Sequence, residues 1–594
     1  MSIYKSSSLA MIPTAYKDGK LYSVRPTDGD GDFTFSRGSN LAATRVASSG
    51  YIEKGRENLI LQSNAITTSP WTGTRIFSQT QGHTGYDGSN DAWLIIPNSS
   101  NNTHYKLQVI SVSNGIQTIS VYAKAGGYDY FSIRDASASD TYGRFDLATQ
   151  TTSTDGSNAI ESKMVSLGGG WYRCSLTLNR TSGGSNNLII YVSNAFGNKP
   201  AYAGDEVSGV YFQDFQVEQG LVATDYIETG ATTAKAGILE DMPRLDYSGG
   251  ATCPSLLLEP QRSNLMVQSE GFSTTAWTDN ATDTNVTANA TTSPEGLQNA
   301  AEIEFTSSSA EIYDQFTNVA SSMHIGTMFL KNNGVNFVEL ELTGGAPSIA
   351  AEVTIDLRDG TLSNQVGDYT PTIEDYGNGW WRVAIGDTGT ATIATPAYKL
   401  KSVGSNTGSF YAFGAQVEAG NYPTSYIPTY GSSVTRSVDV CEDAGSSTTF
   451  NDSEGVLFVE FSALADSGRD NQWRFLISDG TNNNRIQIGL PNATNNLYAS
   501  CIASGVTSAD MTHTLNNASS NHKVAIKYKA NDFAMYVDGV EVDADTSGST
   551  PTGLDIFDFY RTPNNNNYVE ANVKQVIYFP TALTDTELAS LTTL

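Results

Sequence analysis

The sequence predicts an all-β protein made of tandem antiparallel β-sandwiches, with a small, partly irregular β segment at its N-terminal end. Short runs such as residues 118–123 and 172–177 alternate apolar and polar side chains with a period of two, which is typical of half-buried strands. Clusters of Gly, Asn and Ser separate these runs, and the chain holds 54 glycines. Since 39% of the residues are hydrophobic and only 16% are charged, we expect packed cores joined by polar turns rather than disorder.

A long internal repeat indicates that one domain is duplicated. Six residues from Glu53 to Trp71 recur 206 positions later, the last of them as Trp277 (277 − 71 = 206). Further on, GWYR at 170–173 returns as GWWR at 379–382, where the step is 209 (382 − 173 = 209). The drift in the step places insertions in loops between fixed strands. A repeat of this length exceeds the roughly 20–50 residues of a solenoid unit, so it indicates two copies of a whole domain.

At 594 residues the chain is too long for a single hydrophobic core. The repeat divides it into an N-terminal segment (1–56), a first sandwich (57–232), a connector (233–262), a second sandwich (263–440) and an unrelated third sandwich (445–594). We expect residues 1–56 to form a separate element, because they contain short strand-like runs around an Asp/Gly turn.

The third sandwich carries the clearest local signals. Two apolar runs at 533–537 and 540–542 flank Asp538-Gly539, which predicts a hairpin closed by a two-residue turn. Thr584 and Glu587 have the spacing of a capping box, and they predict one short helix at the C-terminal end.

The net charge of −28 excludes some classes of partner. Such a surface repels phosphate backbones, so we expect no nucleic-acid binding. Residues 1–56 are an exception, because they carry eight basic and five acidic side chains (8 − 5 = +3). Two interpretations of this asymmetry stay open: chance in a short segment, and a segment that docks onto an acidic partner surface.

The cysteines and the apolar segments bear on where the chain is made. The four cysteines lie far apart without a CxxC pair, which argues against a disulfide framework or a zinc site. The sequence MSIYKSSSLAMIP at the start lacks the apolar region of a secretory signal, and no stretch approaches 18 apolar residues. We therefore expect synthesis in a cytosol and no membrane insertion.

Several motifs resemble those of structural proteins in tailed-bacteriophage particles. They are residues 32–37 (DFTFSR), 243–247 (PRLDY), 253–265 (CPSLLLEPQRSNL) and 416–436, which contain TSYIPT and end in VTR. The last of these is similar to the close of carbohydrate-binding-like jelly rolls. The block 445–594 resembles the concanavalin A/laminin G-like lectin superfamily.

The resemblance implies a virion component, such as a fibre, spike or adhesin on the head, neck or tail, made and assembled in the host cytoplasm. It implies two jelly rolls in series that project a concanavalin A-like sandwich, and it favours a homotrimer, although the sequence shows no coiled-coil heptads. Residues 1–56 would then contact other virion proteins. The sandwiches would bind host-surface polysaccharide through many weak contacts.

Aromatic side chains beside polar groups are the candidates for sugar binding, because a flat ring can contact the C–H face of a sugar. In each jelly roll two aromatic residues precede a repeated arginine, and strand alternation turns one of them toward the core. We expect Tyr172 and Trp381 to point outward. In the third sandwich the candidates are Trp473, Tyr560, Arg561 and Asn564, which lie beside Asn-rich runs whose amides can hydrogen-bond sugar hydroxyls. A purely structural role is the alternative for each of these residues.

No metal site can be assigned from spacing. Asp28, Asp30 and Asp32 alternate with glycine, but the EF-hand positions for Gly and Glu hold Phe33 and Ser39, so an acidic turn is expected. A structural calcium ion elsewhere stays open, since lectin-like sandwiches often hold one. We expect no other cofactor.

No catalytic group stands out either. The five histidines show no nucleophile-elbow or zinc-ligand spacing. Glu218 and Glu418 recur at the ends of strand-like runs, and we expect them to bond to turn amides. The sequence therefore favours a non-enzymatic glycan-binding protein. The alternatives are a depolymerase, which needs two carboxylates roughly 5–10 Å apart, and a capsid-decorating or neck/tail structural protein that binds no glycan.

Overall fold

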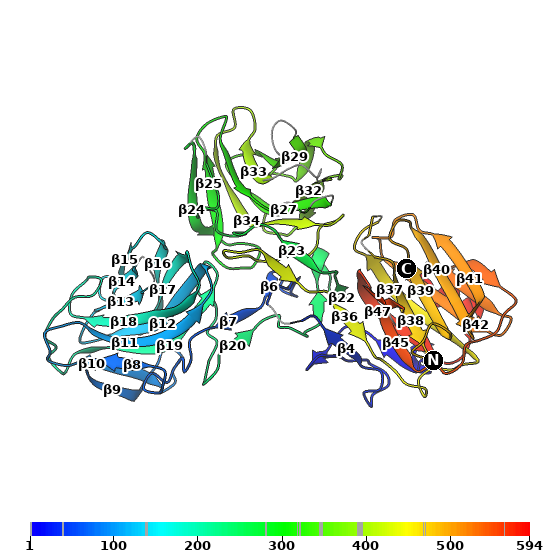
Figure 1. Cartoon of the computed structure of the whole chain (residues 1–594), viewed down its shortest axis with the longest axis horizontal. Helices are drawn as coiled ribbons and strands as arrows, with labels where there is room; N and C mark the ends of the chain where they lie inside the picture. Colours follow the sequence, from blue (N-terminus) through cyan, green and yellow to red (C-terminus); the bar gives the residue numbers. More distant parts are fainter. Residues whose placement is uncertain are drawn as a thin grey trace.

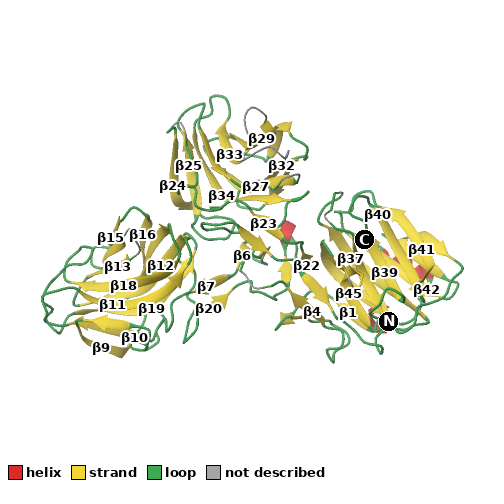
Figure 2. Cartoon of the chain, in the orientation of Figure 1, coloured by secondary structure: helices red, strands yellow, loops and turns green. Residues whose placement is uncertain are grey.

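The computed structural model confirms the all-β prediction and describes residues 3–38, 41–136, 140–279, 282–317, 319, 322–343, 349–388, 396–466, 468–469, 471–562 and 565–594. The chain forms three lobes, each a sandwich of two antiparallel sheets (Figure 1). Within the described ranges, helix is limited to α1 (Asp585–Thr592) and two short 3-10 turns, η1 (Ile3–Ser6) and η2 (Ser248–Gly250), as Figure 2 shows. In this part of the chain no helix has the length and apolar content needed to cross a bilayer.

Sandwich 1 is the first jelly roll and forms the left lobe in Figure 1. Its outer sheet has the order β16-β17-β12-β19-β10-β9, with β9 (Ile76–His83), β10 (Ala92–Pro97), β12 (Gly115–Gly126), β16 (Ala159–Gly168), β17 (Trp171–Arg180) and β19 (Gly209–Gln219). The second sheet has the order β15-β14-β13-β18-β11-β8, with β8 (Thr72–Thr74), β11 (His104–Val112), β13 (Tyr130–Asp135), β14 (Thr141–Asp146), β15 (Thr151–Asp155) and β18 (Gly184–Ser193). Trp71, Phe131 and Phe212 are buried in the core between the sheets.

Sandwich 2 is the second jelly roll and repeats this topology. Its outer sheet has the order β24-β25-β34-β27-β32-β31, with β24 (Thr284–Thr291), β25 (Ala300–Phe305), β27 (Met323–Asn333), β31 (Thr372–Asp375), β32 (Trp380–Thr388) and β34 (Gly408–Ala419). The second sheet has the order β26-β33-β28-β29-β30, with β26 (Glu311–Gln315), β28 (Phe337–Thr343), β29 (Ile349–Asp356), β30 (Thr361–Val366) and β33 (Ala397–Ser402). The two outer sheets have the same strand order, which confirms the duplication.

Sandwich 3 is the C-terminal lobe. One sheet has the order β21-β22-β47-β37-β42-β43-β44, with β21 (Arg244–Asp246), β22 (Ser255–Leu258), β37 (Glu454–Ala463), β42 (His522–Lys529), β43 (Phe533–Val537), β44 (Val540–Asp545) and β47 (Ala571–Phe579). The other has the order β41-β40-β39-β38-β45-β46, with β38 (Trp473–Ser478), β39 (Arg485–Leu490), β40 (Asn496–Ala503), β41 (Val506–Thr514), β45 (Ile556–Thr562) and β46 (Asn565–Tyr568). The connector thus supplies two strands of this lobe.

Both local predictions for sandwich 3 are confirmed. Asp538 and Gly539 link β43 to β44 with positive φ angles of 50° and 90°, as a two-residue hairpin turn requires. Thr584 caps α1 and receives the Glu587 amide, and the Glu587 side chain bonds back to the Thr584 amide.

The N-terminal segment is part of sandwich 3 rather than a separate element. Strand β1 (Leu9–Met11) pairs with β47, and β4 (Phe33–Ser36) joins β2 (Tyr16–Lys17), β3 (Lys20–Leu21) and β36 (Val440–Glu442) in a small sheet. Leu9, Met11, Phe33 and Phe35 lie in the same buried core as the strands of sandwich 3. The expectation of an independent N-terminal element is therefore corrected, because residues 9–35 bury their apolar side chains in sandwich 3 and residues 44–56 belong to the short ladders described next.

Three short ladders lie between the lobes at the centre of the molecule (Figure 1). They are β5 (Thr44–Val46) with β6 (Ile52–Lys54), β7 (Arg56–Asn58) with β20 (Ala234–Ala236), and β23 (Arg262–Asn264) with β35 (Val434–Arg436). The lobes are therefore grouped around a shared centre, where two jelly rolls in series had been expected.

The repeated polar residues close each jelly roll. The Asn58 side-chain amide donates to the carbonyls of Phe215 and Ile227 at 3.0 and 2.8 Å, and its Oδ1 accepts from the amides of Ile60 and Val217. Asn264 makes the same four bonds in sandwich 2. A buried asparagine with every donor and acceptor satisfied holds three chain segments together, which explains its place in the repeat.

Candidate functional site

The paired aromatic residues of the repeat point in the directions opposite to those predicted. Tyr172 and Trp381 pack against the cores between the sheets, whereas Trp171 and Trp380 lie on the outer faces. The Trp381 indole also donates to the carbonyl of Leu357 at 3.2 Å. Both positions are aromatic, so sequence alternation alone could not tell which one faces the core. The outer face carries its own apolar layer, which accommodates the larger side chains there.

The candidate sugar-binding residues of sandwich 3 differ in burial. Trp473 is completely buried in the core, so in this structure its ring offers no face to a sugar, and it is withdrawn as a binding residue. Tyr560 lies half-buried on β45 beside Asp558, which is fully buried. Asn564 and the side chain of Arg561 lie outside the described residues.

The repeated glutamates are structural, as expected. Glu218 accepts from the Thr224 amide at 2.9 Å and from its hydroxyl at 2.5 Å. Glu418 receives the same two bonds from Thr424, at 2.7 and 2.6 Å. Each carboxylate therefore organises the turn that follows the last strand of its sandwich.

A cleft of about 1630 Å³ lies between sandwich 2, sandwich 3 and the central ladders. Its walls come from the β5–β6 turn, the connector around 246–250, the segment 368–378 of sandwich 2, which contains β31, and the segment 462–466 at the end of β37 in sandwich 3. Four tyrosines with solvent-accessible surface line it: Tyr51, Tyr247, Tyr369 and Tyr376. Ligand sites commonly lie at domain boundaries, and this cleft exceeds the roughly 300–1000 Å³ of a small-molecule pocket. It is large enough for an extended ligand.

The charge of the cleft restricts its ligand. Exposed carboxylates of Glu374 and Asp375 line one wall. The two arginines that line it are engaged elsewhere: Arg45 bonds to Glu53 at 2.8 and 3.0 Å, and Arg382 donates to the Thr424 carbonyl at 2.5 Å. Tyrosine faces, hydroxyls and carboxylates without a free cation suit a neutral, hydroxyl-rich ligand better than an anionic one.

A buried group of five ionic side chains, which we call the hub, fixes the walls of this cleft. Its members are Arg37, Arg244, Glu259, Arg436 and Asp439, and their side chains are at most 3% exposed. Glu259 lies 2.5 Å from Arg244 and 2.8 Å from Arg436, while Asp439 contacts Arg244 and lies 3.2 Å from Arg37. Burial alone would raise the pKa of Glu259, but Arg436 and Arg244 outweigh it and hold that pKa below its usual value.

The hub explains the most specific motifs of the sequence. Arg37 ends DFTFSR, Arg244 belongs to PRLDY, Glu259 lies in the connector motif and Arg436 ends VTR. Motifs about 400 residues apart therefore converge on one buried network that joins the N-terminal segment, the connector and the end of sandwich 2. Their role in this structure is to join the lobes.

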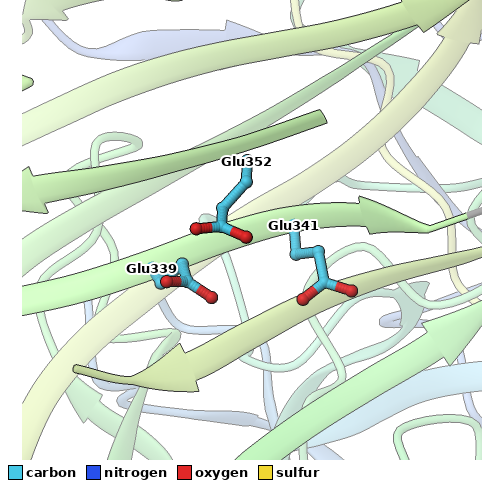
Figure 3. Close-up of side chains that lie close together, drawn as sticks. All are labelled: Glu339, Glu341 and Glu352. Atoms are coloured by element: carbon cyan, nitrogen blue, oxygen red, sulfur yellow. The ribbon is translucent and has the colours of Figure 1, made fainter. Parts of the chain in front are cut away.

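A group of three glutamates lies on β28 and β29, in the second sheet of sandwich 2 (Figure 3). Ligand oxygens of Glu339, Glu341 and Glu352 lie within 4.8 Å of one another. The Lys401 ammonium lies 2.5 Å from Glu339 and 2.6 Å from Glu341, and Lys399 lies 3.5 Å from Glu341. The two lysines pair with Glu339 and Glu341, so this group is explained as an ion-pair network and carries no metal assignment.

Sequence reasoning missed the tyrosines of the cleft and a polar group on the outer face of sandwich 1 formed by Tyr86, Asp87 and Asp91. A cleft between lobes leaves no local pattern in a sequence. The polar group has a signal, because aligning the two copies at a step of 208 places Asp87 opposite Glu295 and Asp91 opposite Asn299.

Comparisons with known proteins were made for the chain. No protein-family model matches it, and no curated protein sequence does. Among solved structures, it is similar to the CBM40 of the Ruminococcus gnavus IT-sialidase bound to alpha2,3 sialyllactose (TM-score 0.22, 13% identity, 25% of this chain and 86% of the other). It is also similar to the N-terminal CBM22-1-CBM22-2 tandem domain of Paenibacillus barcinonensis Xyn10C (TM-score 0.18, 10% identity, 65% and 99%). The LG1-3 region of the laminin alpha2 chain is a third (TM-score 0.15, 10% identity, 81% and 96%). At these scores the similarities carry no argument about function.

Proposed function

We propose that this chain is a non-enzymatic structural protein of a bacteriophage particle that binds neutral glycan chains in the cleft between sandwiches 2 and 3. The observation that carries the glycan part is the tyrosine-lined cleft of about 1630 Å³, which has no free cation among its lining side chains. Sugar rings offer C–H faces to tyrosine rings and hydroxyls to carboxylates and amides. The hub keeps the walls of the cleft in place, so little ordering energy is lost on binding.

The particle role rests on the resemblance of the motifs that build the hub. We propose that a homotrimer attaches to other virion proteins through the N-terminal segment. Although this segment folds into sandwich 3, it leaves Tyr4, Tyr22 and Val24 between 38% and 50% exposed, beside its excess of basic side chains. Several copies on one particle would turn weak single contacts into firm attachment. Light scattering of the purified chain tests the trimer.

The glycan proposal is tested by isothermal titration calorimetry with neutral oligosaccharides chosen from a glycan array. Tyr51 in the cleft and Tyr4 outside it are 40% and 43% exposed, so they form a matched pair. We expect Tyr51→Ala to weaken binding about 3- to 10-fold, which corresponds to an aromatic contact of about 0.5–1.5 kcal/mol, and Tyr4→Ala to leave it unchanged.

The other outcomes separate the alternatives. A blank array, with no ligand for the intact chain, would refute glycan binding and support a purely structural particle protein. New reducing ends after incubation with a bound polysaccharide would show turnover and support a depolymerase. Equal losses for both tyrosine variants would remove the cleft as the site.

A further inference from the structure

The duplicated fold builds the same outer face twice, and only on sandwich 2 do the described residues include a covering segment from outside the sandwich. On sandwich 2, Ile52 of β6 is buried against Phe329, Trp380 and Phe413. Its amide donates to the carbonyl of Pro294 at 2.9 Å. The corresponding cluster on sandwich 1 contains only its own described residues: Ala92, Tyr122 and Trp171, with Tyr86, Tyr211 and Tyr226 packed against them.

The covering segment of sandwich 2 ends in a buried ammonium group. Lys54 Nζ lies 3.0 Å from Glu270 and 2.8 Å from Glu295, and the two carboxylates are at most 2% exposed. The Asn299 amide donates to both carboxylates, at 3.3 and 3.0 Å. This part of the fold therefore binds an ammonium in sandwich 2, using the loop before β25.

Sandwich 1 has carboxylates at the equivalent place, but no counterpart of Lys54 lies among its described residues. Asp87 and Asp91 stand at the positions of Glu295 and Asn299 (295 − 87 = 208; 299 − 91 = 208), and Asn64 stands at that of Glu270 (270 − 64 = 206). Asn64 donates to Asp91 at 2.9 Å, so acid and amide have exchanged places between the copies.

Two neutral donors take the place of the ammonium, and one of them is the Ser89 hydroxyl, which donates to Asp87 at 2.6 Å and also to Asp91. The Gln213 amide donates to Asp87 at 3.2 Å and to Asp91 at 2.8 Å. Asp87 is exposed and Asp91 is half-buried, so an approaching cation can reach both. Among the described residues no cationic side chain pairs with either carboxylate, whereas the duplicate holds a lysine at this position.

Tyr86 decides what kind of molecule fits. Its ring stacks on Tyr122 with centroids 3.6 Å apart and planes within 3°, and it fills the place that Ile52 has in sandwich 2. Its hydroxyl donates to the buried Asp214 at 3.0 Å, which fixes the ring. A peptide strand with an aliphatic side chain has no room there, whereas the half-buried tyrosine ring can stack on a flat ligand.

We propose that the outer face of sandwich 1 binds an amino sugar with a free ammonium group. Tyr86 contacts the C–H face of the ring, and Asp87 and Asp91 bind the ammonium as Glu295 and Glu270 bind Lys54. This site lies on another lobe than the cleft, and its binding does not depend on the cleft. It adds a cationic sugar to the neutral class proposed above.

The test is calorimetry on the full chain in 150 mM salt with a glucosamine trisaccharide, with its fully N-acetylated counterpart and with a lysine tripeptide. We expect the free-amine sugar to bind at least about tenfold more tightly than either of the others, as a charge-assisted hydrogen bond of about 1.5–3 kcal/mol implies. A short ligand at this salt limits attraction to the overall charge of −28.

Variants separate the site from general acidity. We expect Asp87→Asn and Asp91→Asn each to reduce free-amine binding about tenfold, while Asp18→Asn, whose side chain is 87% exposed elsewhere, leaves it unchanged. Tyr51→Ala should not affect it, so failure of the cleft and failure of this site give different results. Equal binding of free and acetylated sugars, or unchanged binding by both Asp variants, would overturn the proposal. Tighter binding of the lysine peptide would assign the face to a protein partner instead.

Discussion

Removing one arginine from the hub should destabilise the joint between sandwiches 2 and 3. Arg244 is completely buried and donates to Glu259 at 2.5 Å, to the Ser425 hydroxyl at 2.8 Å and to the Thr44 carbonyl at 3.2 Å, besides contacting Asp439. Arg244→Met keeps an apolar side chain but leaves two buried carboxylates with less positive charge. Breaking a buried ion pair costs about 3–5 kcal/mol.

The lower end of that range applies here, because Glu259 keeps Arg436 and Asp439 keeps Arg37. A loss of about 3 kcal/mol corresponds to a fall of about 6–12 °C in the Tm of a lobe of this size. Differential scanning calorimetry is the assay, since a chain of three lobes need not unfold in one step.

The control is Arg358→Met, which removes a 2.6 Å ion pair to Asp356 whose arginine is 56% exposed, and we expect a change of at most about 1 kcal/mol. A second check is the double variant with Glu259→Gln, whose effect should be smaller than the sum of the two single effects. If Arg244→Met melts within about 2 °C of the unaltered chain, the hub does not stabilise this joint and the reasoning fails.

Three further predictions concern other parts of the molecule. Deleting residues 1–56 removes β1 and five side chains buried in the core of sandwich 3, which are worth about 1.5–3 kcal/mol each, so the truncated chain should expose its core and aggregate; a monodisperse truncated chain that binds no hydrophobic dye would contradict this. Gly115→Ala should cost about 2–3 kcal/mol in thermal unfolding, because a Cβ there would lie 1.2 Å from the Tyr430 carbonyl oxygen, while Gly88→Ala, with a similar φ of 85° and no neighbour within 4 Å, should cost less. Burial raises the pKa of Asp214 to about 7, so its protonated form favours the folded state and sandwich 1 should lose stability, by at most about 4 kcal/mol, as the pH rises from about 4 to above 7. Asp214→Asn should flatten that part of the profile in a series of melting curves, and an unchanged slope would show that another group titrates.

The repeat made the two jelly rolls predictable, because a fixed step between Trp71 and Trp277 fixes equivalent strands without knowledge of their partners. The hairpin at Asp538 and the cap at Thr584 were predictable for a similar reason, since each depends on residues at most four positions apart. The pairing of strands far apart in the sequence was not predictable. Strands β1 and β4 have no local signal for a partner that lies more than 400 residues away. The sequence therefore predicted that residues 1–56 form a separate segment.

The candidate site was less predictable from the sequence. Trp171 and Tyr172 are both aromatic, and a single step in register exchanges the two faces of a strand. The outer faces proved to be covered, one by Ile52 and the other by Tyr86, and neither cover could be inferred from strand alternation. Comparing the two copies position by position was the one sequence signal that could have led to Asp87 and Asp91.

The pairing of β1 with β47 sets an order of events during synthesis. Leu9 lies opposite Tyr578, so the sheet of sandwich 3 cannot be completed until almost all of the intervening chain has left the ribosome. Until then the apolar side chains of residues 9–35 lack the complete core of sandwich 3, while sandwiches 1 and 2 can already fold. A ribosome stalled before residue 571 would leave a nascent chain that has every strand of sandwiches 1 and 2, while strand β1 has no β47 to pair with.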